Sequence, residues 1–218
     1  MAMLYIALAA AAAMLSPNAT RDVSVGAPPA AAGAATATIT GFRSAHFRMT
    51  PQSVRRAIAT DFPGSAIVER TNPIEGTITL QIVVDILDPG PGAATVSYVF
   101  GATTRTLAQV GIVWTTTGDA TPDDRQAIAV AGLRLSRYLS GRNPTGTPIP
   151  PRIVRADVLD LYSAVDAQGA GVELIAGGIA YSDKGAPAVA PSGPAFLRLS
   201  YMANPANPDI SPTPARRG

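Results

Sequence analysis

The feature that most constrains the fold of this chain is a set of short runs in which apolar residues return at every second position. Residues 78–84 and 96–100 alternate apolar with polar side chains, and a third strand-like run, 105–115, contains the single tryptophan, Trp114. Successive side chains of a strand point to opposite faces of a sheet, so this alternation predicts strands with one buried face. Glycine and proline at 88–92 predict a turn, and the three runs together predict an antiparallel meander.

Two segments of the sequence carry the signals of a helix start. Thr50 can cap free backbone N–H groups, and Pro51 fits the first helical turn without losing a hydrogen bond. The second segment, Thr121-Pro122-Asp123-Asp124, adds two acids beside the positive end of the helix dipole. Apolar residues then recur at helical spacing in both segments. We expect the first helix to end before Pro63 and the second to end at Gly141.

A second series of strand-like runs follows the second helix, at residues 153–165, 171–181 and 195–202. The order of a helix and then three strands therefore occurs twice, although the two halves do not align residue by residue. Because each sheet must cover one apolar face, the sequence predicts an α+β fold. It would consist of two helix-then-three-strand antiparallel meander units, with the helices packed on one face. Whether the two sheets merge into one stays open.

The two ends of the chain differ from its centre. Residues 3–15 form an unbroken apolar run, which is too short for the roughly 20 residues of a membrane span but suits a signal peptide. We expect a signal peptide over 1–20, a disordered tether rich in Ala, Gly, Pro and Thr over 21–38, an α+β domain over 39–203 with halves 39–118 and 119–203, and an extended Pro-rich tail over 204–218. The mature protein would then be periplasmic or secreted, without a transmembrane span.

The amino-acid composition excludes several kinds of site chemistry. Hydrophobic residues make up 47% of the chain and charged residues 15%, which is typical of a globular domain with a sizeable core. The chain has no cysteine, so disulfides, thiolate metal ligands and thiol nucleophiles are excluded. The basic residues number 17 and include one lysine, Lys184. Such an excess of arginine reflects genome composition more than a partner, so no nucleic acid is expected.

The segment Gly41-Phe-Arg-Ser-Ala45, followed by Met49-Thr50 before the first helix, resembles the opening of a family of exported bacterial proteins of uncharacterised function. Stretches within 94–114 and 197–210 extend the resemblance. The Met-Thr opening is also similar to small periplasmic modules related to the beta-lactamase-inhibitor protein and the small barrel-assembly lipoprotein. That likeness implies helices packed on antiparallel sheets and a protein partner. Arg48 departs from it, because such modules usually carry glycine there, and no catalytic residue comes with it.

Two clusters of polar residues were considered as catalytic or metal sites. Ser44 and His46 are close in sequence, but a catalytic pair needs a third group to orient the imidazole. Asp119, Asp123 and Asp124 crowd the start of the second helix, but they lack the glycine and the distal glutamate of a calcium loop. Helix capping already accounts for the last two acids.

A third cluster, Asp157, Asp160 and Asp166, lies along one predicted strand but does not share a single face. The paired carboxylates of a glycan-acting hydrolase are therefore not indicated. We expect no catalytic residue, no metal site and no cofactor.

The strongest candidate for a binding surface is a group of arginines with no acid among them. Its members are Arg125, Arg134, Arg137, Arg142, Arg152 and Arg155. Guanidinium groups bind phosphates, anionic lipid head groups or an acidic protein face, and all three alternatives stay open. The alternative is that these arginines have no binding function and are charged residues of a solvated helix face and of loops.

These observations favour an exported, non-enzymatic module that binds another protein or an envelope component. Two alternatives stay open. One is an envelope hydrolase that uses only Asp and Arg residues and brings two carboxylates together in a cleft. The other is a carrier of a small apolar or anionic ligand, which requires an enclosed pocket lined by the aromatic residues of the meander.

Overall fold

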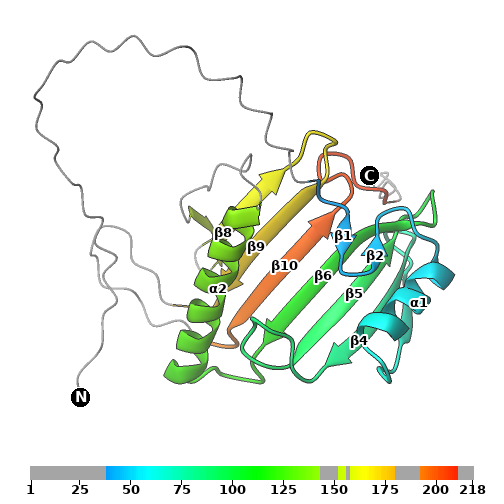
Figure 1. The fold of residues 1–218 in the computed structure, drawn as a ribbon. Coiled ribbons are helices and arrows are strands. Elements are labelled where there is room, and N and C mark those ends of the chain that lie inside the picture. Colours follow the sequence, from blue (N-terminus) through cyan, green and yellow to red (C-terminus); the bar gives the residue numbers. More distant parts are fainter. Residues whose placement is uncertain (1–37, 143–151, 156–157, 180–191, 211–218) are drawn as a thin grey trace, which may run out of the picture. The chain divides into compact units, whose positions relative to one another are not determined.

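The computed structural model describes residues 38–142, 152–155, 158–179 and 192–210, which all belong to one compact unit, Ala35–Gly218 (Figure 1). The side chains of 142 and 152–155 are not described. The expected signal peptide over 1–20, the tether up to residue 37 and the end of the tail, 211–218, lie outside the described residues.

The main element of the fold is one antiparallel sheet of eight strands, with the order β3-β4-β5-β6-β10-β9-β8-β7. The elements are β1 Gly41–Phe42, β2 Ala45–His46, α1 Pro51–Asp61, β3 Val68–Asn72, β4 Thr77–Val84, β5 Ala94–Phe100, β6 Leu107–Thr115, α2 Pro122–Arg142, β7 Arg152–Arg155, β8 Val158–Val165, β9 Gly171–Gly177 and β10 Phe196–Met202. β1 and β2 form a separate two-stranded sheet.

The two halves of the chain meet at the centre of the large sheet. β6 pairs with β10, and Trp114 and Ile112 lie opposite Leu197 and Leu199. β10 also pairs with β9 on its other side. The strands of the two halves therefore merge into one sheet, which settles the question that the sequence left open.

The predicted fold class was wrong. The sequence predicted an α+β fold of two helix-then-three-strand units, whereas the described residues are mostly β structure with two helices. Four strands follow each helix, and all eight belong to one sheet. The helices also do not each cover a sheet of their own. α2 lies against β8, β9 and β10, while the main contacts of α1 are with the short strand β2.

The two strands that the sequence analysis missed form the edges of the sheet. β3 is exposed over nearly its whole length and carries Glu69 and Arg70, so it shows no apolar alternation. β7 has only 4 residues. It was included in the predicted run 153–165, which the structure divides into β7 and β8. A charged or very short edge strand lacks the pattern of a half-buried strand, which explains the error.

Both helices begin where their capping residues predict. The Thr50 hydroxyl accepts a hydrogen bond from the Ser53 backbone N–H at 3.3 Å. At α2 the Thr121 hydroxyl accepts from the Asp124 N–H at 3.2 Å, and the Asp124 carboxylate accepts from the Thr121 N–H at 2.9 Å. This reciprocal pair is a capping box. The hydrogen bonds from Thr121 lower the pKa of Asp124 below its usual range. α2 continues through Gly141, where the sequence analysis expected it to end.

The part of the chain that the structure describes has no helix with the length and apolar character needed to cross a membrane.

The hydrophobic core is one cluster of buried side chains from the strands and from both helices. Along β5 the side chains at 94, 96, 98 and 100 are buried, and those between them are partly exposed. This matches the alternation seen in the sequence. Both helices contribute buried residues to the same cluster: Val54, Ala57 and Ile58 from α1, and Ile128, Ala131, Leu135 and Leu139 from α2.

The hairpin of β1 and β2 is fastened to the end of α1. A two-residue turn, Arg43-Ser44, joins its strands, and Arg43 has a φ of 53°, as the tight turns of such hairpins require. The Ser44 backbone N–H and hydroxyl donate to the carboxylate of Asp61 at 3.0 and 2.7 Å. The Gly-Phe-Arg-Ser-Ala segment therefore has a structural role.

The chain after β10 is fastened to the turn between β5 and β6. The Asp209 carboxylate accepts hydrogen bonds from the Thr104 hydroxyl at 2.7 Å and from the backbone N–H groups of Thr104 and Thr103, each at 2.9 Å. These bonds, that from the Thr104 hydroxyl foremost, lower the pKa of Asp209 to about 2. A Cβ on Gly101 would lie 2.0 Å from this carboxylate, so glycine permits the close approach.

Replacing Tyr98 by phenylalanine is expected to raise the free energy of unfolding by about 1 kcal/mol, because a buried hydroxyl without a partner is costly. Tyr98 is fully buried in the middle of β5, and its hydroxyl has no hydrogen-bond partner among the described residues. Burial, with a contribution from the Asp61 carboxylate, raises the pKa of this hydroxyl. Urea denaturation of both proteins measures the difference. A lower midpoint for Tyr98→Phe would contradict the prediction.

Candidate functional site

A cavity of about 930 Å³ lies on the helix side of the sheet, between α2 and the segment 38–43 that forms β1. α2 and the β1–β2 hairpin lie on the same side of the sheet (Figure 1). β6, β8, β9 and β10 supply the floor, and residues 87–89, from the connection between β4 and β5, close one end. Pockets of roughly 300–1,000 Å³ hold small organic ligands, so this cavity has the size of a ligand site.

The floor of the cavity is apolar. Four of its residues, Ile112, Trp114, Val172 and Leu199, are at most 4% exposed. Tyr201 lies beside them and stacks on Phe42, with the ring centroids 5.9 Å apart. The strand register explains the grouping, because alternate residues of neighbouring strands point to the same face.

Trp114 holds the connection between β4 and β5 in place at the end of the cavity. Its indole N–H donates to the backbone carbonyl of Leu87 at 3.2 Å. Gly90 packs directly against the ring, and a Cβ at this position would lie 2.0 Å from it. The glycine of the predicted turn is therefore needed where the connection crosses the indole.

Charged groups lie at the rim. Arg134 of α2 lines one side, together with Tyr138, and both side chains are exposed. Arg43 and Asp88, also exposed, line other parts of the rim. The cavity therefore combines an apolar floor with two guanidinium groups and one carboxylate at its opening.

Asp166 fixes the segment that leads into β1. One carboxylate oxygen accepts from the Ile39 N–H at 2.8 Å. The other accepts from the N–H groups of Gln168 and Ala170, each at 2.9 Å, within the turn between β8 and β9. Asp166 is only 6% exposed, and Ile39 lines the cavity. This carboxylate therefore joins one wall of the cavity to the sheet.

The structure separates the arginines that the sequence grouped together. Arg125 donates to the backbone carbonyls of Gly178 and, at 2.9 Å, Gly193, so its guanidinium fastens α2 to the connection between β9 and β10. Arg134 lines the cavity, and Arg137 is exposed and does not line it. The side chains of Arg142, Arg152 and Arg155 lie outside the described residues.

The polar clusters considered as catalytic or metal sites have structural partners. The Ser44 hydroxyl donates to Asp61, as described above, while the His46 side chain is exposed. The Asp119 carboxylate accepts from the Gly193 N–H at 3.0 Å, and Asp124 caps α2. In the described ranges, no group of three or more acids and histidines is arranged to hold a metal ion.

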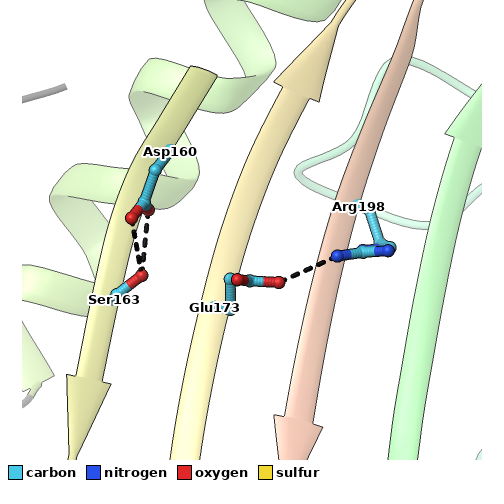
Figure 2. A network of polar contacts seen from close by, with 4 residues as sticks. All are labelled: Asp160, Ser163, Glu173 and Arg198. Carbon is cyan, nitrogen blue, oxygen red and sulfur yellow. Dashed lines mark hydrogen bonds and ion pairs between the residues drawn. The ribbon is translucent and has the colours of Figure 1, made fainter. Parts of the chain in front are cut away.

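A polar network lies on β8, β9 and β10 (Figure 2). The Ser163 hydroxyl donates to both carboxylate oxygens of Asp160, at 2.9 and 3.0 Å, and Asp160 is 2% exposed. Next to it Glu173 and Arg198 form an ion pair of 2.9 Å. Neither carboxylate lines the cavity. Asp157, which the sequence placed with Asp160 and Asp166 along one predicted strand, lies outside the described residues.

Only part of this site could be predicted from the sequence. Arg134 was expected in a group of arginines and Trp114 in a strand-like run, and nothing in the sequence connected the two. The cavity depends on β10 lying between β6 and β9 and on α2 lying against β8, β9 and β10, and this placement has no signal in local periodicity. Ile39 and Asp166 were not recognised as partners, because 127 positions separate them.

Comparison of the chain with protein-family models, with curated proteins and with solved structures finds no match in any of the three, so the family resemblance stays a prediction and the site must be interpreted from its own geometry.

Proposed function

We propose that the domain binds a small, mostly apolar molecule in the cavity between α2 and β1. The observation that carries this proposal is a volume of about 930 Å³ above buried apolar side chains, with a few polar groups at the opening. Small-molecule sites have this distribution, because apolar contacts supply affinity and a few polar groups orient the ligand. This corresponds to the carrier function that the sequence left as an alternative, except that the cavity is partly open to solvent and not enclosed.

The other two functions derive less support from the described residues. A glycan-acting hydrolase needs two converging carboxylates, and Asp88 is the one acid among the described residues that line this cavity. The protein or envelope partner and the export of the protein stay predictions, because the cavity bears on neither.

The single tryptophan offers a direct measurement. Trp114 lies in the floor of the cavity, so an occupant changes the surroundings of the indole. We expect the neutral apolar probe N-phenylnaphthylamine to become more fluorescent on binding and to quench Trp114 with saturation. Absence of saturable binding would contradict the proposal.

The Val172→Phe variant is expected to bind this probe at least about tenfold more weakly, which corresponds to about 1.4 kcal/mol, because the larger ring occupies part of the cavity. Val172 is 4% exposed and lies on β9 in the floor. Val113→Phe is the matched control: Val113 lies on β6 between Ile112 and Trp114, so it points to the opposite face. Thermal unfolding checks that both variants fold. Equal affinities of two folded variants would show that the probe binds elsewhere.

A further inference from the structure

We infer that the ligand of this cavity is an amphiphile whose anionic group is bound by Arg134 at the rim. The inference rests on the proposed function and adds the chemical class of the ligand. It depends on which charged groups of the rim already have partners and which do not.

Arg134 is the uncommitted cation of the rim. It lies on α2 immediately before Leu135, which lines the cavity wall, and its side chain is exposed. Within the described ranges it has no hydrogen bond or ion pair. Arg134 also lines a smaller hollow of about 470 Å³ between α2 and residues 89–91. The guanidinium can therefore reach over the opening without breaking an existing contact.

Arg125, earlier on the same helix, shows the contrast. Its guanidinium donates to two backbone carbonyls and is used to hold the fold together. No comparable structural use accounts for Arg134. An arginine presents several N–H donors in a planar arrangement that fits carboxylate, sulfate or phosphate oxygens, so an anion is the complementary partner.

Arg43 adds a second positive charge at another part of the rim. Its guanidinium lies over the rings of Phe62 and Phe42, at 4.7 and 5.6 Å from the centroids, which restricts its position. With Arg134 and Asp88, the charged groups among the described residues that line the cavity carry a net charge of +1, since two are cations and one is an anion. The opening therefore favours a ligand with one negative group. The Asp88 carboxylate disfavours a ligand with several negative charges.

The apolar floor distinguishes an amphiphile from a free anion. The hydroxyl groups in the floor come from Tyr162 and Tyr201. Ile112, Trp114 and Leu199 offer no hydrogen-bond donor to a small ion, because the indole N–H already donates to Leu87. Desolvating an anion against such side chains is unfavourable. A chain against the floor with its head group at Arg134 satisfies both parts of the cavity.

The experiment tests three competitors for displacement of N-phenylnaphthylamine from the full chain. They are dodecanoate below its micelle-forming concentration, dodecanol below its solubility limit, and inorganic phosphate. Dodecanoate is expected to bind about five- to tenfold more tightly than dodecanol, a range appropriate to a charged contact that is partly exposed to solvent. Phosphate alone is expected to displace no probe. The Arg134→Gln variant should bind the two chain compounds equally, through a loss of affinity for dodecanoate alone.

Arg137→Gln is the matched control, because it removes the same charge from the same helix outside the cavity. It should preserve the preference for dodecanoate. The inference is overturned if dodecanol and dodecanoate bind the native protein equally, if Arg137→Gln acts as strongly as Arg134→Gln, or if phosphate displaces the probe. Failure of the proposed function gives a different result, since N-phenylnaphthylamine itself would not bind.

Discussion

The Asp166→Ala variant is expected to unfold with a free energy about 3 to 5 kcal/mol lower than that of the native protein, because it leaves three backbone N–H groups without their acceptor. Those groups belong to Ile39, Gln168 and Ala170, and the carboxylate that accepts from them is 6% exposed. Water cannot easily replace a carboxylate at this depth. Urea denaturation measures the change, and the probe used above should also bind more weakly because Ile39 lines the cavity.

The Asp166→Asn variant separates the hydrogen bond that fixes Ile39 from the two that fix the turn at Gln168 and Ala170. Its amide oxygen can still accept from Gln168 and Ala170, whereas its amide nitrogen would face the N–H of Ile39. We expect a smaller loss of about 1.5 to 3 kcal/mol, the value of one hydrogen bond to a charged group. Faster hydrogen exchange should be confined to the region of Ile39. If the alanine variant were as stable as the native protein, the carboxylate would not be what fastens this wall.

Replacing Gly41 by alanine is expected to lower the free energy of unfolding by about 2 to 4 kcal/mol, because non-glycine residues are strained in this backbone conformation. Gly41 has a φ of 139°. A Cβ at this position would also lie 2.2 Å from the carbonyl oxygen of Ala45, across the hairpin. The strands must therefore separate. Because residues 41–43 line the cavity, ligand affinity should fall together with the midpoint of thermal unfolding.

Gly118→Ala is a suitable control for this substitution. Gly118 has a φ of 68°, and among the described residues no atom beyond its own chain neighbours lies within 4 Å of the position of its Cβ. It should therefore show only the cost of a left-handed residue, about 1 kcal/mol. A Gly41→Ala variant that is no less stable than Gly118→Ala would show that the hairpin adjusts without penalty.

The elements that were predicted well are those whose signal is local. Thr50 and Thr121 mark the helix starts because a cap contacts residues three positions away. The buried side of β5 follows from alternation along a single strand. By contrast, β3 was not predicted. It is an edge strand whose exposed charged residues, Glu69 and Arg70, disfavour pairing with other chains, and such a strand has no apolar alternation.

The site was less accessible to prediction because it is formed by residues far apart in sequence. Arg125 and Arg134 have the same charge on the same helix, and only the carbonyls of Gly178 and Gly193 distinguish their roles. The sequence therefore predicted a patch of arginines, whereas the structure shows one structural arginine and one at the rim of a cavity. Without homologous sequences, no local pattern identifies such a difference.

The position of β10 has a consequence for biosynthesis. Phe196–Met202 is the last of the described strands to leave the ribosome, yet it lies between β6 and β9 and pairs with both. Until it arrives, the nascent chain has two unfinished half-sheets, each with a free hydrogen-bonding edge and unburied apolar side chains. Such species invite wrong pairing. We therefore expect the domain to complete its folding only after β10 has left the ribosome, and a polypeptide that stops before residue 196 to aggregate.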